Sequence, residues 1–227
     1  MQNINVLILG TTGYVGSVLC RTLDRKSHRV SALVRPHSQV QAIQSFCKRI
    51  HRNRTGEFTP NEVEEIIRSD DIQTVISCAW NMPPEQTKEE QFAKDRIALD
   101  AALYGARTAS SDVHVITTSG NFSLITGEGG TVTETPPPPG TPRPEYMAWA
   151  DLLSGVNILK DNLTEHYIRQ GGNASILYPG SVYGPSPNQR NFWELAGNIG
   201  PEMRYIPGWK VFEKMARIFF EGKEVIV

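Results

Sequence analysis

The stretch Ile4-Asn5-Val6-Leu7-Ile8-Leu9-Gly10-Thr11-Thr12-Gly13-Tyr14-Val15-Gly16 decides the fold class. Its first six residues are nearly all apolar, which is typical of a strand buried on both faces of a parallel sheet. The residues that follow the glycine-rich turn carry apolar side chains at helical spacing, at Val15, Val18, Leu19 and Leu23. This spacing predicts a helix with one face packed back on the strand.

The same alternation continues along the chain. Apolar runs predict further strands at residues 29–34, 74–78, 113–117 and 174–177. Amphipathic segments predict helices at residues 61–68, 86–108 and 151–170. A third strand would fall within residues 48–54, but this stretch is strongly basic and poorly patterned, typical of a solvated edge or a phosphate contact. Strands that alternate with helices indicate an α/β fold with a doubly wound parallel sheet.

The composition describes a soluble globular domain. The 227 residues include 23 Lys+Arg and 24 Asp+Glu, so a formal charge of −1 excludes electrostatic attraction of the whole chain to nucleic acid or anionic lipid. No apolar run approaches the roughly 18 residues that a membrane span needs, and residues 1–5 are too polar for a secretory signal. We therefore expect a cytoplasmic protein with no membrane or nucleic-acid partner.

The cysteines and histidines predict no metal site. The three cysteines are far apart in sequence and the five histidines lack ligand spacing; they are Cys20, Cys47, Cys78, His28, His37, His51, His114 and His166. We expect reduced and mostly buried thiols.

The glycines of the first turn predict a nucleotide site. Gly10 permits the tight turn, Gly13 lets a pyrophosphate approach the backbone, and Gly16 allows the helix to press on the strand. Backbone N–H groups at the start of the helix would then face the phosphates. The other candidates in this turn are Thr12, Tyr14 and Val15. A glycine triplet also occurs in ordinary turns, but the strand before it and the helix after it favour nucleotide binding.

Arg35 follows the second predicted strand, where an NAD site would place a carboxylate to bind the adenosine ribose. The local sequence Ala-Leu-Val-Arg-Pro at 32–36 contains no carboxylate. Arg35 could instead bind a ribose 2′-phosphate through two hydrogen bonds, which favours NADP(H) over NAD(H). The alternative interpretation is a solvated surface arginine.

Four blocks of sequence resemble the NAD(P)-dependent epimerase/dehydratase type of the extended short-chain dehydrogenase/reductase superfamily. They are the glycine turn at 10–16, Val-Ile-Ser-Cys-Ala at 75–79, Thr-Thr-Ser-Gly at 117–120, and Ile-Leu-Tyr-Pro-Gly-Ser-Val-Tyr-Gly-Pro at 176–185. The resemblance implies a Rossmann-like NAD(P)-binding domain over residues 1–185 and a truncated or minimal substrate lobe at 186–227. It adds these cofactor-binding candidates: Cys78, Ala79, Trp80, Thr118, Tyr178, Pro179, Gly180, Ser181 and Val182.

The catalytic pattern of that family is missing here. Its members typically use a serine or threonine after the fifth strand, and a tyrosine and lysine four residues apart on the next helix. No tyrosine of this chain has a lysine four residues later, and the expected pair falls near Leu153 and Asn157. A proton donor would have to come from elsewhere. The candidates are Ser119, Ser123 and Tyr146, with Tyr178 and Tyr183 as further alternatives.

Three of the catalytic candidates have a plain structural alternative. Tyr146 follows a proline-rich stretch at 127–144 that predicts a surface loop, where its ring could simply cover the pocket. Ser123 could satisfy a loop backbone. Tyr183 could pack in the core.

Three functions fit these features. The leading hypothesis is an NADP(H)-binding oxidoreductase that reduces a small carbonyl, imine or enone substrate with a non-standard proton donor. The second is a cofactor-bound regulator or redox sensor similar to the NmrA-like group. The third is a non-redox isomerase or cyclase that uses the pocket for positioning alone.

An apolar helical stripe at 211–219 also favours a homo-oligomer.

Overall fold

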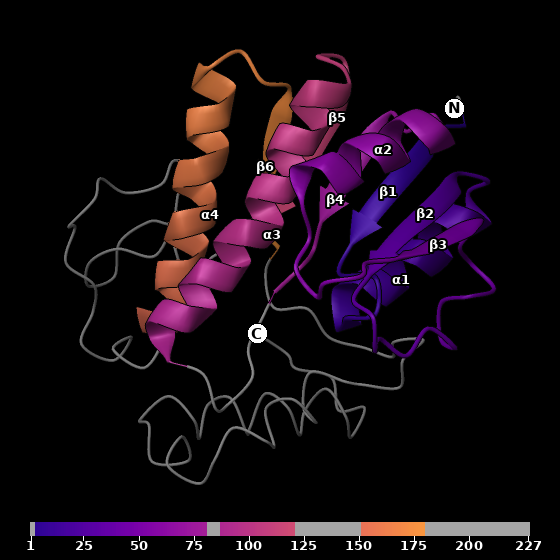
Figure 1. The fold of residues 1–227 in the computed structure, drawn as a ribbon, viewed down its shortest axis with the longest axis horizontal. Helices are drawn as coiled ribbons and strands as arrows, with labels where there is room; N and C mark the ends of the chain where they lie inside the picture. Colours follow the sequence, from indigo (N-terminus) through magenta and orange to yellow (C-terminus); the bar gives the residue numbers. More distant parts are fainter. Residues whose placement is uncertain (1–2, 81–86, 121–150, 180–227) are drawn as a thin grey trace, which may run out of the picture.

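Six parallel strands form a single sheet in the order β3-β2-β1-β4-β5-β6 (Figure 1). The structure is a computed structural model that describes residues 3–80, 87–120 and 151–179. The strands are β1 (Asn5–Leu9), β2 (Arg29–Val34), β3 (Arg49–Arg52), β4 (Thr74–Ser77), β5 (His114–Thr118) and β6 (Ala174–Leu177). The chain leaves β1 toward β2 on one side and returns from β3 to β4 on the other. The strand order therefore reverses between β1 and β4, which is where ligands bind in such sheets.

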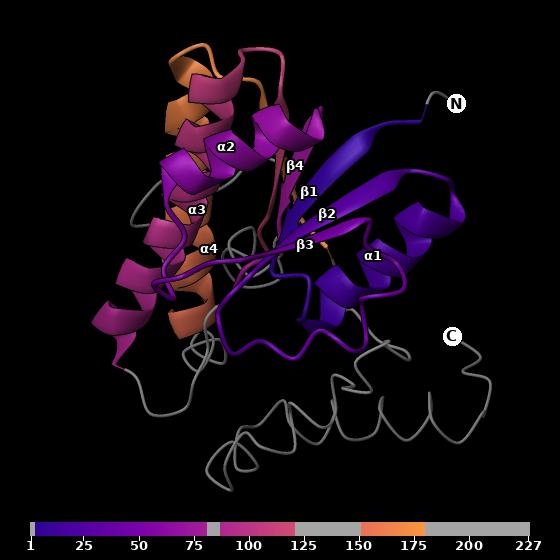
Figure 2. The same ribbon diagram turned by 45° about the vertical axis from the view of Figure 1, so that its right-hand side comes forward.

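Four helices cover the two faces of the sheet. They are α1 (Tyr14–Arg25), α2 (Pro60–Asp70), α3 (Lys88–Ala109) and α4 (Asp151–Arg169). Figure 2 shows α1 on one face, and α2, α3 and α4 on the other. The expected α/β fold with a doubly wound parallel sheet is confirmed.

The apolar run of β1 is continuous because both faces of this strand are buried. Leu7 and Leu9 belong to the core beneath α2 and α3, with Leu99 and Leu103 of α3. Val6 and Ile8, which alternate with them along the strand, belong to the core beneath α1, which includes Cys20. Period-two alternation on a strand sends neighbouring side chains to opposite faces, so a central strand needs apolar residues at every position.

Helix caps set two boundaries that apolar periodicity alone does not define. The side chain of Thr59 accepts a hydrogen bond from the backbone N–H of Glu62, and Pro60 occupies the first turn of α2. Thr87 and Glu90 form a reciprocal capping box, so α3 begins at Lys88 rather than at residue 86 as predicted.

The basic stretch at 48–54 contains a strand that the sequence pattern leaves undefined. Strand β3 pairs with β2 and forms the edge of the sheet, which agrees with the expectation of an exposed edge. Its basic side chains have partners. Arg49 and His51 bind the carboxylate of Asp70, and Arg52 donates to the carbonyls of Pro36 and Ser38. These contacts replace the apolar packing that would have revealed the strand in the sequence.

Asp70 ties the end of α2 to the edge of the sheet. Its carboxylate is 4% exposed and accepts hydrogen bonds from Ser31, Arg49 and His51, with the Ser31 hydroxyl at 2.6 Å. Burial raises the pKa of this carboxyl, but the bonds from Ser31, His51 and Arg49 outweigh it and lower the pKa to about 2. The folded protein therefore favours the charged carboxylate.

Some of the sequence-based predictions fall outside the described residues. They are the loop at 127–144, the substrate lobe at 186–227 and its apolar helix at 211–219, together with the end of the predicted 1–185 domain. Within the described ranges, no helix combines the length and apolar character that a membrane span requires.

Replacement of Asp70 by Asn should lower the free energy of unfolding at pH 7 by about 1–2 kcal/mol. Because the pKa of Asp70 is lowered on folding, its contribution is present above about pH 4 and is lost as the pH falls toward 2. Urea denaturation between pH 2 and 7 should therefore show a weaker acid dependence for Asp70→Asn than for wild type. The exposed neighbour Asp71 is the control, and Asp71→Asn should behave as wild type. Identical acid profiles for all three proteins would contradict this role of Asp70.

Candidate functional site

The glycine turn joins β1 to α1 at the carboxyl edge of the sheet. Gly10 has a φ of +86°, and a Cβ placed on it would lie 2.7 Å from the backbone of Cys78 and Ala79. A Cβ on Gly16 would overlap the carbonyl of Gly10. The N–H of Gly13 donates to that same carbonyl at 3.0 Å and closes the turn. Larger residues at positions 10 and 16 would push α1 and β4 away from the turn.

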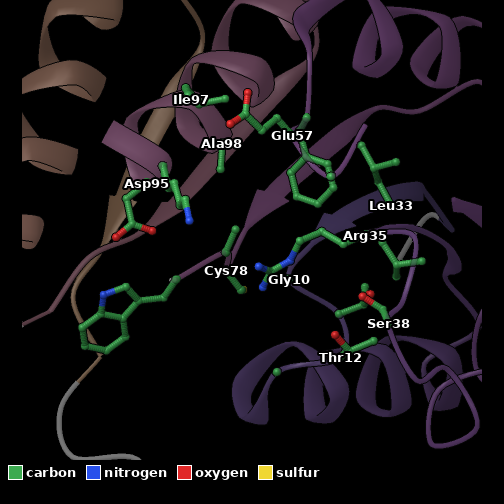
Figure 3. A pocket seen from close by; sticks show the side chains of 18 of the residues that line it. Gly10, Thr12, Leu33, Arg35, Ser38, Glu57, Cys78, Asp95, Ile97 and Ala98 are labelled. Carbon is green, nitrogen blue, oxygen red and sulfur yellow. The ribbon is translucent and has the colours of Figure 1, made fainter. Parts of the chain in front are cut away.

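A cleft of about 450 Å³ opens above this turn (Figure 3). It lies at the carboxyl ends of β1, β2 and β4, at the point where the strand order reverses. Its walls come from the glycine turn, the end of β2, the β3–α2 loop, the end of β4 and the first half of α3. The lining includes seven of the predicted cofactor-binding residues: Gly10, Thr12, Gly13, Arg35, Cys78, Ala79 and Trp80.

Two sources of positive potential face this cleft. The start of α1 lies at the cleft, where Gly13 is part of the lining, and it brings the positive end of the helix dipole there. The side chain of Arg35 is exposed, and Figure 3 shows its guanidinium reaching into the cavity above the glycine turn. Ser38 lines the same side. An anionic ligand therefore fits this part of the cleft.

Thr11 adds a polar group that has no partner in the described structure. Its side chain is fully buried beside the turn, and its hydroxyl has no hydrogen-bond partner among the described residues. Buried hydroxyls are nearly always satisfied, so this one requires a ligand or water. The glycines pack this turn closely against its own backbone and the end of β4, so the Thr11 hydroxyl is the buried polar group of the turn that is left for a ligand or water to satisfy.

The β3–α2 loop is held in place by Asn53, a residue whose role the sequence leaves open. This residue is 4% exposed, and its side-chain amide donates to the carbonyl of Glu57 at 2.9 Å and accepts from the N–H of Thr55 at 3.0 Å. Asn53 therefore shapes the loop, whereas Glu57 lines the cleft.

The other predicted residues lie beside the cleft or outside the described ranges. Val15 and Gly16 belong to the first turn of α1, as does Tyr14, whose pKa is raised by burial. The Thr118 hydroxyl donates to the carbonyl of Ser77 at 2.8 Å, so it joins β5 to β4. Pro179 is half-buried. The residues outside the described ranges are Ser123, Tyr146, Gly180, Ser181, Val182 and Tyr183.

Asn157 occupies the space next to the end of β5. It is 4% exposed, and a Cβ on Gly120 would lie 2.5 Å from its amide nitrogen. The hydroxyl of Ser119 donates to the backbone carbonyl of Asn157 at 3.5 Å. Ser119 is therefore the predicted catalytic residue that the structure places at the end of β5, beside α4. The side chain of Leu153 lies outside the described part of α4.

Lys160 is a site residue that the sequence analysis missed. It lies three residues after Asn157 on α4 and is 5% exposed. Its ammonium donates to the carbonyl of Ala79 at 3.1 Å and to that of Thr118 at 3.5 Å, and lies 5.8 Å from the ring centre of Trp80. A lysine among apolar positions of a helix that follows the fifth strand is the sequence signal that could have found it.

Tyr178 follows β6, and the charged residues that act on its side chain, Asp161 and Glu165, belong to α4. Burial, and after it the charges of Asp161 and Glu165, raise the pKa of its hydroxyl. This phenol therefore holds its proton strongly and is a poor acid at neutral pH.

The expectation of reduced and mostly buried thiols is confirmed in part. Cys20 is buried, whereas Cys47 and Cys78 are only half-buried, and all three are free. Burial raises the pKa of Cys78 to about 11, so the thiol that lines the cleft is protonated at neutral pH. Over the part of the chain that the structure describes, no group of three His, Cys, Asp or Glu side chains is arranged to bind a metal ion.

The sheet order and the glycine turn at its reversal point define a Rossmann-like α/β protein. The chain belongs to the NAD dependent epimerase/dehydratase family, whose model matches residues 6–197. This confirms the resemblance seen in the four sequence blocks. No curated protein gives a significant match to the chain.

Solved structures show the same fold at low sequence identity. The gox2253 protein is 20% identical with a TM-score of 0.66, covering 81% of this chain and 53% of its own. A reductase engineered for asymmetric catalysis is 12% identical with a TM-score of 0.65, and the match covers 82% of this chain and 60% of the reductase. The dTDP-glucose 4,6-dehydratase of Bacillus anthracis, in complex with NAD, is 14% identical with a TM-score of 0.62, covering 81% and 56%. The chain thus spans between half and two thirds of the length of these proteins.

Replacement of Gly10 by Ala should lower the free energy of unfolding by about 2–4 kcal/mol, because positive φ and overlap with β4 both oppose a side chain there. Gly171 is the matched control, since its φ is +82° but nothing lies within 4 Å of the position that a methyl group would take. Gly171→Ala should cost only about 1–2 kcal/mol. Equal losses in urea denaturation would show that contact with β4 does not require Gly10.

Proposed function

We propose that the chain binds NADP(H) in this cleft and acts as an NADPH-dependent oxidoreductase on a small carbonyl, imine or enone substrate. The observation that carries the proposal is that Arg35 and the glycine turn face one cavity of about 450 Å³. Family membership supports a nicotinamide dinucleotide as the ligand. Arg35 supports the phosphorylated form, because a guanidinium binds a phosphate through two charge-assisted hydrogen bonds.

Different residues of the cleft bind different parts of the dinucleotide. The pyrophosphate binds at the start of α1, where Gly10 and Gly13 line the cleft and the Thr11 hydroxyl gains a partner. Arg35 binds the 2′-phosphate at the end of β2, with Ser38 on the same wall. The nicotinamide half extends along Ala79 and Trp80 at the end of β4. The segment from Tyr178 to Val182 completes this half by analogy with the family.

The chemistry requires a hydride and a proton. Bound NADPH supplies the hydride. The chain must hold the substrate oxygen or nitrogen and direct a proton to it. Ser119 lies at the end of β5 with its hydroxyl already engaged to the Asn157 carbonyl, and it can turn that hydroxyl toward a substrate atom. Ser123 and Tyr146 are the other proposed donors.

A cofactor-bound regulator is the second candidate, and Asn157 is the observation that favours it. Asn157 stands where the family resemblance predicts the lysine of the dyad, and it is packed against Gly120. An amide neither lowers the pKa of a neighbouring phenol nor transfers a proton. A chain that binds NADP(H) without turnover would fit this arrangement.

Loss of the Arg35 guanidinium should weaken NADPH binding by roughly 10- to 100-fold, as expected for a charged hydrogen-bonded pair. NADH binding should change little, and Arg35→Asp should reverse the preference. Calorimetric titration of Arg35→Ala with both nucleotides tests this, and Arg25→Ala, at the far end of α1, is the control. A wild-type protein that binds neither nucleotide would refute the proposed function, and equal affinity for both would refute the preference for NADP(H).

A measurement of substrate turnover distinguishes the proposed oxidoreductase from the proposed regulator. We expect NADPH oxidation with a panel of small aldehydes, ketones, imines and enones, followed by absorbance at the nicotinamide band. Ser119→Ala should lower kcat by about 10²-fold or more if Ser119 donates the proton, while NADPH affinity stays unchanged. Tight NADPH binding with no oxidation of any substrate in the panel would instead support the regulator.

A further inference from the structure

Lys160 places a positive charge in the interior, between α4 and the carboxyl ends of β4 and β5. Its side chain is 5% exposed, and burial lowers the pKa of its amine. The acidic groups that face it come from three elements: Asp95 on α3, Asp161 on α4 and Cys78 after β4. These groups raise the pKa of the amine but do not offset burial. A lysine here costs stability that an apolar side chain of similar size would not.

Two of the three contacts of this ammonium are with residues that line the cleft. The carbonyl of Ala79, its acceptor at 3.1 Å, belongs to a residue whose N–H lies against Gly10. Trp80, whose ring centre lies 5.8 Å from the ammonium, is the next residue and is 45% exposed. Ala79 and Trp80 both line the cleft. A cation at this distance from an indole attracts it, and the attraction strengthens when water is excluded.

The second acceptor joins the neighbouring strand to the same point. Lys160 donates to the carbonyl of Thr118 at 3.5 Å, and the Thr118 hydroxyl donates to the carbonyl of Ser77. One ammonium therefore holds the ends of β4 and β5 together beneath the wall that Ala79 and Trp80 form.

We propose that Lys160 is a positioning residue for the bound dinucleotide, fixing Ala79 and Trp80 as the wall against which its nicotinamide half lies. The inference rests on the proposed function and deepens it. Lys160 acts through the wall and does not itself touch the ligand. A buried lysine costs stability, but an apolar side chain at position 160 would leave the Trp80 ring without a cation beside it.

The charge state of Lys160 gives stability and binding opposite pH dependences. Between its lowered pKa and the ordinary lysine value of about 10.4, the unfolded chain binds more protons than the folded one, so the free energy of unfolding rises with pH. Dinucleotide affinity falls over the same window, because the neutral amine loses its attraction to the indole. A purely structural lysine would alter stability alone.

The test compares Lys160→Met, Lys160→Arg and the exposed control Lys26→Met in NADPH titrations from pH 7.5 to 10. Lys160→Met should fold at least as stably as wild type and bind NADPH roughly 10-fold more weakly at pH 7.5. Its affinity should not vary with pH in the window where wild type weakens. Lys160→Arg should retain affinity at every pH, and Lys26→Met should follow wild type.

Fluorescence of Trp80 tests the wall without the ligand. In a background where the other tryptophans, Trp149, Trp193 and Trp209, are replaced by Phe, Lys160→Met should increase acrylamide quenching of Trp80, because the ring loses the cation that holds it. Lys26→Met should not.

The outcomes separate the two claims. Wild-type binding that Lys160→Met leaves unchanged at all pH values overturns the positioning role. Failure of wild type to bind either nucleotide refutes the proposed function instead. In that case the quenching result tests whether Lys160 holds Trp80 in place. Increased quenching in Lys160→Met supports this contact, and unchanged quenching overturns it.

Discussion

The close approach of Gly10 to the end of β4 is the constraint on which the rest of the site depends. A side chain at this position would lie 2.7 Å from the backbone of Cys78 and Ala79, so only glycine lets β1 end and turn into α1 beside β4. This contact stands where the strand order reverses, and it directs the first turn of α1 toward the cleft. The geometry of the turn, which we propose binds the phosphates, thus follows from a packing requirement between two neighbouring strands.

Charge is distributed around this contact on two sides. The helix terminus and Arg35 face the cavity, whereas Lys160 lies behind its wall and faces Asp95 and Asp161. The first pair suits an anionic ligand directly. The buried ammonium acts on the same Ala79 backbone that Gly10 approaches, so the two halves of the site meet at one residue. Where the family resemblance predicts a catalytic lysine, Asn157 fills the space, and a lysine three residues later turns to the strand ends instead.

Local pattern predicts most of the fold because central strands such as β1 and β2 are defined by apolar runs that both buried faces of the sheet require. Strand β3 is different, since its side chains are stabilised by the carboxylate of Asp70 and no apolar pattern marks it. The glycine turn and Arg35 were predictable from motif and position. The sequence marks Lys160 only by its place among apolar positions of a helix, and its contacts result from the packing of α4 against the ends of β4 and β5. Asn53 is a similar case, as its partners lie within a loop that no pattern specifies.

The central claim is that the cleft above the glycine turn is the dinucleotide site. Backbone amide shifts of the isotopically labelled protein, recorded by NMR during a titration with NADPH, test it most directly. We expect the largest changes at Gly10–Gly16, around Arg35 and at Ala79–Trp80, with little change at the far edge near Asp70. Changes centred elsewhere, or none at saturating nucleotide, would contradict it.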